Sequence, residues 1–308
     1  MSASTAQRPP APSASGEAST AERRRAGVTT STPVGRATAN AVLVAASLYC
    51  LLPAYWLVVA ATKNQPDLAG SFGFWFARQN LPANITSLFA EQQNVFGVWL
   101  LNSLLYSGVG AAISTVLAAL AGYALAVYPF RGRELYFGLV LGSVLVPTTA
   151  LALPTFLLFA KAGMTNTYWA VLLPSIVSPF GVYLCRIYAA AAVPTEVLEA
   201  ARIDGAGEVR IFRAVVWRLL TPALVTTFLF QFVGIWNNFY LPLIMLQDDR
   251  LYPVTLGLFT WQSQISRDPH LQVLVVVGSF VSVVPLVVTF LALQRHWRAG
   301  LGAGAVKA

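Results

Sequence analysis

The residues best suited to nucleophilic, acid–base or metal chemistry are few in this chain. Its 308 residues include only two cysteines, Cys50 and Cys185, and two histidines, His270 and His296. Both cysteines fall inside long apolar runs, which excludes a disulfide framework. The histidines lie at opposite ends of the last apolar run, so they cannot share a metal ion. We therefore expect no metal site, no cofactor and no enzymatic activity.

Nucleotide hydrolysis and proton coupling also lack the residues that they need. A phosphate-binding loop carries a glycine directly before its lysine, whereas the three lysines here follow Thr62, Ala160 and Val306. Proton-coupled transporters place acids or histidines within the membrane, and the apolar runs contain none. Asp248 and Asp249 have too few acidic neighbours for a cation site. We interpret them as part of a solvated loop.

The scarcity of charge indicates the class of protein. Charged residues make up 10% of the chain and hydrophobic residues 56%, whereas a soluble domain has about 25% charged residues. Six charge-free stretches each exceed the roughly 20 residues that cross a bilayer as a helix. Lipid offers no partners for backbone amides, and the runs do not alternate in polarity as barrel strands do, so helices are expected. The expected spans are about 40–62, 98–128, 135–159, 166–187, 219–246 and 271–294.

Two local features qualify this pattern of spans. The run Leu251–Ser266 is also free of charge, but it is short and carries several polar side chains. We expect a loop there. Prolines inside the spans predict kinks or breaks, because proline removes a helical hydrogen bond. They are Pro53, Pro147, Pro154, Pro174, Pro179, Pro242 and Pro285.

The basic residues indicate the orientation. Six spans place both termini on one side of the membrane, and only five bases fall on the other side. Those five are Lys63, Arg78, Lys161, Arg250 and Arg267. The positive-inside rule therefore predicts that both termini are cytoplasmic. Five acids balance the external bases, so the net charge of +8 lies entirely on the cytoplasmic side. The basic excess reports topology, and no nucleic-acid partner is expected.

The first 38 residues differ from the rest. They are rich in Ala, Ser, Thr and Pro, a composition typical of disorder. We expect a disordered cytoplasmic tail over 1–38 and one membrane domain over 39–308. Arg23–Arg25 precede the first apolar run, but that run is longer than the core of a signal peptide. An uncleaved first span is favoured.

The cytoplasmic loop over 194–222 has an internal structure of its own. Pro194 and Glu196 favour the first turn of a helix, and Gly205 favours its end. After the glycine, apolar residues at helical spacing lead into the fifth span. They are Ile211, Phe212, Val215, Val216 and Leu219. We expect a short surface helix, a glycine turn and a helix that returns to the membrane.

Within this loop, Glu199-Ala200-Ala201-Arg202-Ile203-Asp204-Gly205-Ala206 resembles the EAA loop of permease subunits of bacterial ABC importers. Phe212 and Pro222 also match that family. Other segments are similar to its carbohydrate branch, and specifically to the second permease of the maltose importer. They are Asn102-Ser103, Trp236-Asn237-Asn238-Phe239, Pro242-Leu243, Thr255-Leu256-Gly257-Leu258 and Gly304-Ala305-Val306-Lys307. The similarity covers about residues 38–308. Trp217-Arg218 replaces a usual Leu-Pro pair, which puts the kink before the fifth span in question.

The resemblance implies an all-α, type I ABC importer permease fold with six transmembrane helices in the bacterial inner membrane. It implies three kinds of protein partner: an ATPase dimer, a second homologous permease and an extracytoplasmic solute-binding protein. Lipid surrounds the spans. The loop helix would dock on the ATPase, where Glu199 would face a basic group. Ala200 and Ala201 would allow close approach, and Asp204 with Gly205 would turn the chain.

Substrate contacts are expected in the fifth span. Trp236, Asn237, Asn238 and Tyr240 could contact the hydroxyls and ring faces of a sugar, and packing is the alternative for each. A polyol or glycerol-phosphate-type solute is an alternative substrate class. A stand-alone secondary transporter or channel is the alternative function, but it predicts an internal repeat or an intramembrane ionisable group, and we see neither. The alternative for the loop helix is a position on the lipid headgroups.

Overall fold

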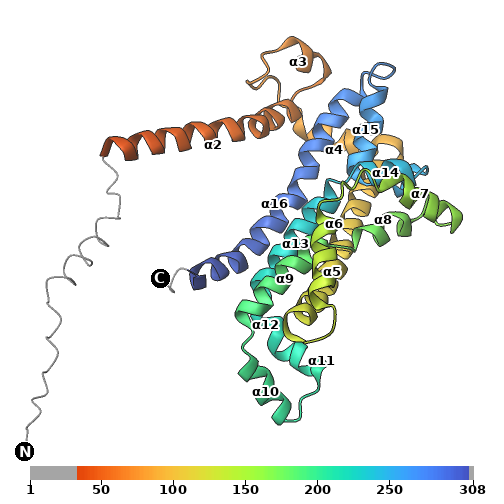
Figure 1. Cartoon of the computed structure of the whole chain (residues 1–308). Coiled ribbons are helices and arrows are strands. Elements are labelled where there is room, and N and C mark those ends of the chain that lie inside the picture. Colours follow the sequence, from red (N-terminus) through yellow and green to blue (C-terminus); the bar gives the residue numbers. More distant parts are fainter. Residues whose placement is uncertain (1–32, 305–308) are drawn as a thin grey trace, which may run out of the picture. The chain divides into compact units, whose positions relative to one another are not determined.

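The computed structural model describes the backbone of residues 33–304 and the side chains of residues 33–294. All regular structure in this range is helical (Figure 1), as expected. The chain divides into two units, Met1–Tyr55 and Trp56–Ala308. Helix α2 (Pro33–Ala61) contains all described residues of the first unit. Residues 33–38 of the expected tail are therefore helical, and the rest of that tail lies outside the described residues.

The other helices belong to the second unit. They are α3 (Gln65–Gly70), α4 (Leu81–Ala90), α5 (Val95–Val127), α6 (Arg133–Val144), α7 (Ala152–Lys161), α8 (Tyr168–Ser175), α9 (Pro179–Ala192), α10 (Thr195–Ile203), α11 (Glu208–Ile211), α12 (Trp217–Leu219), α13 (Thr221–Trp236), α14 (Tyr240–Met245), α15 (Val254–Gln264) and α16 (Leu271–Gly304). A π-helical turn, Phe212–Val216, joins α11 to α12. In this unit α10 and α11 lie at one end of the bundle, and α4 and α15 lie at the other (Figure 1).

Long apolar helices occupy most of the expected spans. Among the described residues, four segments are long and apolar enough to cross a membrane: α2, α5, α8 with α9, and α16 up to Gln294. A fifth crossing is present if α11–α12 and α13, bent by 80°, form one span. These segments match the first, second, fourth, sixth and fifth expected spans. The chain is therefore an all-α, multi-pass membrane protein.

The third expected span, 135–159, is not one continuous helix. It consists of α6 and α7, which are separated by turns over 145–151. Pro147 lies in those turns, where its ring and missing N–H prevent helix continuation. No residue of α6 is buried. Glu134 nevertheless binds Arg186 of α9 at 2.8 Å, and this hydrogen bond lowers the pKa of Glu134.

The prediction of a loop over Leu251–Ser266 is wrong, because most of this segment forms helix α15. Leu256 and Trp261 on this helix are 2% and 1% exposed. The ring of Trp261 lies 4.7 Å from that of Trp99 on α5. The helix is thus held by tertiary contacts with distant residues, which the length of a charge-free run does not reveal.

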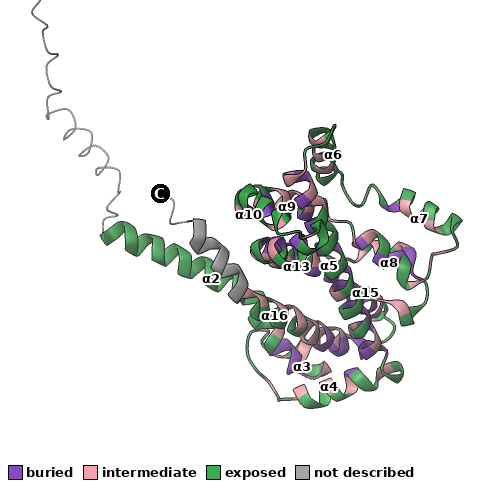
Figure 2. Ribbon diagram, turned by 90° about the horizontal axis from the view of Figure 1, so that it is seen from below, coloured by how far each residue is buried: buried purple, intermediate pink, exposed green. Residues whose placement is uncertain are grey.

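Helix α5 is at the centre of the second unit. It packs against α9 and α13, and buried residues gather along these helices (Figure 2). A Cβ atom built on Gly122 would lie 2.6 Å from the Cβ atom of Cys185 and 2.7 Å from the backbone nitrogen of Arg186. Ala118 and Ala119 are also fully buried on this helix. Small residues therefore let α5 and α9 approach each other closely.

Candidate functional site

Helix α10 ends as the sequence predicts, in a glycine turn. Gly205 has a φ of +78°, a conformation that costs other L-residues about 1–2 kcal/mol. Its N–H donates to the carbonyl of Arg202, and the N–H of Ala206 donates to that of Ala201, each at 3.0 Å. This pair of bonds defines a Schellman motif, which satisfies carbonyls at the end of a helix.

One side of α10 is anchored and the other is presented to the surroundings. Leu198 is 1% exposed and packs in a buried cluster with Ile211 and Tyr123. Ala201 is half-buried against the same cluster. The other predicted docking residues, Glu199, Ala200, Asp204 and Gly205, are exposed. The structure thus offers four of these five residues as one outer surface.

A polar connection ties α10 to the neighbouring helices. Arg202 contacts Glu208 of α11 through Nε and Oε1 at 2.8 Å, and its second nitrogen lies 3.4 Å from Oε2. The hydroxyl of Tyr128, which directly follows α5, donates a hydrogen bond to the same carboxylate. The bond to Glu208 raises the pKa of Arg202. Glu208 therefore joins three elements in one network on the protein surface.

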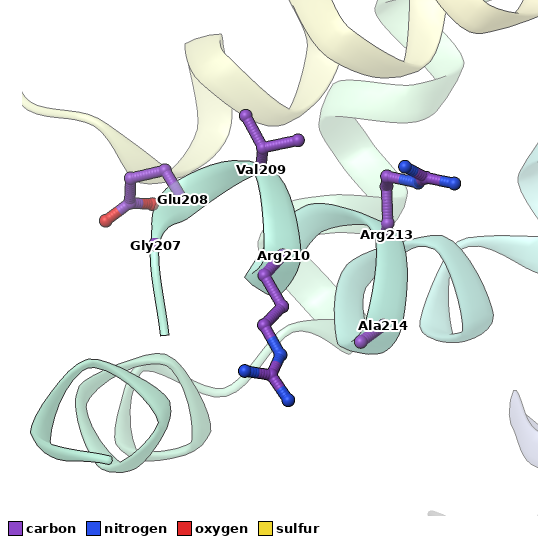
Figure 3. Close-up of a pocket in the computed structure, with 6 residues that line it drawn as sticks. All are labelled: Gly207, Glu208, Val209, Arg210, Arg213 and Ala214. Atoms are coloured by element: carbon purple, nitrogen blue, oxygen red, sulfur yellow. The ribbon is translucent and has the colours of Figure 1, made fainter. Parts of the chain in front are cut away.

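The chain that follows this network is basic and amphipathic. A surface hollow of about 750 Å³ is lined by Gly207, Glu208, Val209, Arg210, Arg213 and Ala214. The side chains of Arg210 and Arg213 project to different sides of this segment (Figure 3). Ile203, the last residue of α10, is 86% exposed, and Val209 is 73% exposed. Apolar and cationic groups are thus available at the end of α10 and in the segment that follows it.

The bend before the fifth span is present although Trp217-Arg218 replaces the Leu-Pro pair. Helices α11–α12 and α13 meet at 80° across Leu220. Pro222 lies in the first turn of α13, where the missing N–H of proline is tolerated. Leu220 is fully buried at the corner. Packing of Leu220 and the position of Pro222 together account for the bend.

The four predicted pathway residues lie at a break in the fifth span, between α13 and α14. Trp236 is 2% exposed, and its ring lies 5.8 Å from that of Phe232, so it belongs to the core. Asn238 accepts a hydrogen bond from the N–H of Leu241 at the start of α14. Asn237 and Tyr240 are exposed. Asn237 and Tyr240 are therefore the most accessible of the four side chains, while Asn238 is half-buried.

The sequence did not predict a row of polar side chains on α5 that holds the segment before α15 and the first residue of that helix. Trp99, Asn102, Ser103 and Tyr106 follow helical spacing, so they lie on one face of α5. Trp99 donates a hydrogen bond to the carbonyl of Asp249 at 2.7 Å, and Asn102 donates to that of Arg250 at 2.8 Å. Tyr106 donates to the carbonyl of Leu251 at 3.0 Å. The hydroxyl of Ser103 accepts a hydrogen bond from the N–H of Val254 at 2.7 Å. The spacing was the signal that could have identified this row.

Comparisons with known proteins agree with this architecture. Residues 114–301 match the family described as binding-protein-dependent transport system inner membrane component. The chain is 37% identical to the arabinooligosaccharides transport system permease protein of Halalkalibacterium halodurans, over 73% of this chain and 78% of that protein. It is 32% identical to the lactose transport system permease protein of Rhizobium radiobacter, over 86% and 94%.

The fold is similar to that of solved structures, among them a bacterial ABC transporter involved in the import of the acidic polysaccharide alginate, with a TM-score of 0.74 and 20% identity. The alignment covers 86% of this chain and 98% of that one.

The chain belongs to the family of binding-protein-dependent transport system inner membrane components. It is a multi-pass inner membrane protein. More particularly, it is the non-catalytic permease subunit of an ABC importer for carbohydrates.

Proposed function

We propose that α10 is the coupling helix of this importer and docks on a separate ATPase subunit. The observation that carries the proposal is the two-sided character of α10. Leu198 fixes one side to the bundle, and Glu199, Ala200 and Asp204 cover the other. A helix that is both anchored and exposed can pass a push from a partner to the membrane helices.

The proposed topology has six crossings and both termini in the cytoplasm. The third crossing would be made by α6 and α7 together, since irregular backbone is tolerated in a membrane where protein covers it. Fifteen bases on the side of α10, against five on the other, support this orientation. The ATPase would then approach α10 from the cytoplasm.

The proposed solute is an oligosaccharide. The names of several relatives support this class, among them the permeases for arabinooligosaccharides, lactose, and melibiose, raffinose and stachyose. Asn237 and Tyr240 are the residues we expect to contact it, because they are exposed at the break in the fifth span. The remaining partners would be a second homologous permease and an extracytoplasmic solute-binding protein.

The docking proposal can be tested by adding bulk to the outer surface of α10. Ala200→Trp places a large ring on an exposed position, so the chain itself should fold normally. We expect the variant to lose the ATPase subunit during purification in detergent and to lose ATP-driven sugar uptake. Ser263→Trp adds similar bulk at an exposed position of α15 and should keep both.

A second variant separates docking from a general defect of α10. Glu199→Lys keeps the helix but reverses the charge that would face a basic group on the ATPase. We expect it to weaken recovery of the ATPase as Ala200→Trp does. If both α10 variants keep the ATPase and transport at the level of the Ser263→Trp control, α10 is not the docking helix.

A further inference from the structure

A closed loop after α2 carries an unusual concentration of aromatic side chains. We name residues 63–80 the aromatic loop; it includes α3 (Figure 1). Four of the five residues from 72 to 76 are aromatic: Phe72, Phe74, Trp75 and Phe76. Phe72 and Trp75 are 73% and 67% exposed. Exposed aromatic patches of this kind mark sites of interaction.

The aromatic loop is held in place, so the exposure of its side chains is built into the fold. The N–H of Asn80 donates to the carbonyl of Thr62 at 2.9 Å and closes the loop at its base. Lys63 is 1% exposed, and its Nζ donates to the carbonyl of Phe72 at 2.8 Å. The amide of Asn84 donates to the carbonyls of Ala61 and Lys63, each at 2.9 Å. These bonds fix the backbone that carries the aromatic rings.

The position of the loop relative to the end of α2 indicates its depth. A Cβ atom on Gly73 would lie 3.7 Å from Nε1 of Trp56. Trp56 precedes the last residue of α2 by five positions, which corresponds to about 7 Å along the helix axis. The loop therefore folds back beside the final turns of a membrane-crossing helix instead of extending beyond its end. Trp56 is itself 40% exposed, so the aromatic surface continues from the loop onto the helix.

The charge pattern favours lipid over water or a polar protein surface. Between Asp67 and Glu91 the only charged residue is Arg78. Aromatic side chains concentrate at membrane–water boundaries, where their rings lie at the level of the headgroups. The part of the loop that carries the aromatic rings, residues 68–80, thus has one exposed cation and no acid, which suits a layer that contains anionic phosphates.

From these observations we infer that the aromatic loop is a lipid anchor. Phe72 and Trp75 enter the headgroup layer beside α2, and Arg78 lies near the lipid phosphates. The anchor fixes the outer end of α2 against the membrane while other helices move. The assignment to the outer leaflet rests on the proposed topology, whereas contact with lipid does not.

The depth of the loop can be measured with spin labels. A spin label is attached to the new cysteine of the Trp75→Cys variant or of the Phe72→Cys variant. Each variant also carries Cys50→Ser and Cys185→Ala, so that no native cysteine remains. The assembled transporter, with partner cysteines replaced, is reconstituted in vesicles of phosphatidylethanolamine and phosphatidylglycerol. Accessibility to molecular oxygen, which enriches in lipid, is compared with accessibility to a water-soluble nickel chelate. Val288→Cys on α16, 58% exposed, is the lipid reference, and Arg267→Cys before α16 is the water reference.

We compare the ratio of oxygen accessibility to nickel accessibility at each labelled position. At positions 72 and 75 we expect this ratio to be several-fold higher than at the water reference, position 267, and lower than at the lipid reference, position 288. A ratio at both sites equal to that at 267 places the loop in water and overturns the proposal. Low accessibility to both reagents means that protein covers the loop, which also overturns it. If nickel accessibility is high at first and falls only when the solute-binding protein is added, the loop is a docking surface for that protein. Because the readout is depth and not transport, it is independent of whether α10 docks on the ATPase.

Discussion

Two glycines in this permease are required for different physical reasons. Gly205 must adopt a φ of +78° to end α10, although a Cβ atom there would meet nothing within 4 Å. Gly122 lies in regular helix, but its Cβ position is already occupied by the backbone of α9. One glycine supplies backbone freedom and the other supplies space. Substitution by alanine should therefore affect different properties.

Gly205→Ala should loosen the end of α10 without disturbing the bundle. The left-handed backbone costs alanine about 1 kcal/mol, which corresponds to roughly fivefold faster local opening. Hydrogen exchange at the amide of Ala206, which donates to Ala201, measures this opening. Gly207→Ala is the matched control, because Gly207 has a φ of −70° and open space around it. Equal acceleration in both variants would contradict the role of the turn.

At the level of elements, two sets of contacts join α10 and α11 to the bundle. The buried cluster around Leu198 and Ile211 is apolar, and the network of Arg202, Glu208 and Tyr128 is polar and exposed. Exposed ion pairs add little stability. We therefore expect the polar network to govern the orientation of α10 relative to α11 and α5, and the apolar cluster to provide most of the stability.

Reversing the charges of the ion pair tests this division. Arg202→Glu or Glu208→Arg alone places like charges together, so we expect less sugar uptake per ATP hydrolysed. The double variant restores opposite charges and should recover much of the coupling, although the acceptor for Tyr128 is lost. The measurement is the ratio of uptake to ATP hydrolysis in vesicles. If the double variant performs no better than either single variant, the pair does not orient α10.

The contact of α5 with α9 gives a stability prediction for a pair of helices. Gly122→Ala forces the helices apart, and overpacking of this kind typically costs about 1–3 kcal/mol. Gly108→Ala lies on the same helix with nothing within 4 Å and should be neutral or slightly stabilising. Thermal unfolding in detergent compares the two. A lower midpoint for Gly122→Ala alone is expected, and equal midpoints would argue against close packing at this site.

At the scale of the molecule, the chain has features of a component rather than of a complete transporter. It has no phosphate-binding loop in its sequence, and its apolar runs contain no acid or histidine. As a component of a binding-protein-dependent ABC transporter, the chain works with ATPase and binding-protein partners. The exposed surface of α10 lies at one end of the bundle, and the break between α13 and α14 lies in the fifth span (Figure 1).

Reconstitution of separate components tests this dependence. We expect no sugar accumulation in vesicles that contain only this chain, and ATP-dependent accumulation when the ATPase, the second permease and the solute-binding protein are added. The sugar should belong to the solute class proposed above, the oligosaccharides. Accumulation by the chain alone, driven by an ion gradient, would establish the alternative of a secondary transporter.

Some expectations from the sequence held because they depend on local properties. The positions of α2, α5 and α16 follow from runs without charge, and the end of α10 follows from Gly205. Other features depend on contacts between distant segments. Trp99 binds a carbonyl 150 positions later in the chain, and helix α15 is stable because Trp261 packs on that same tryptophan. No pattern within residues 251–266 reports such contacts.

The sequence by itself determined that this protein is an all-helical membrane protein. The reason is that the cost of placing a charge in lipid acts on each residue separately and is visible in every span. Only the tertiary structure decided that α15 is a helix, that Trp236 belongs to the core while Asn237 and Tyr240 are open, and that the aromatic loop folds back beside Trp56. These outcomes depend on which distant side chains occupy the same space, and a single sequence does not contain that information in local form.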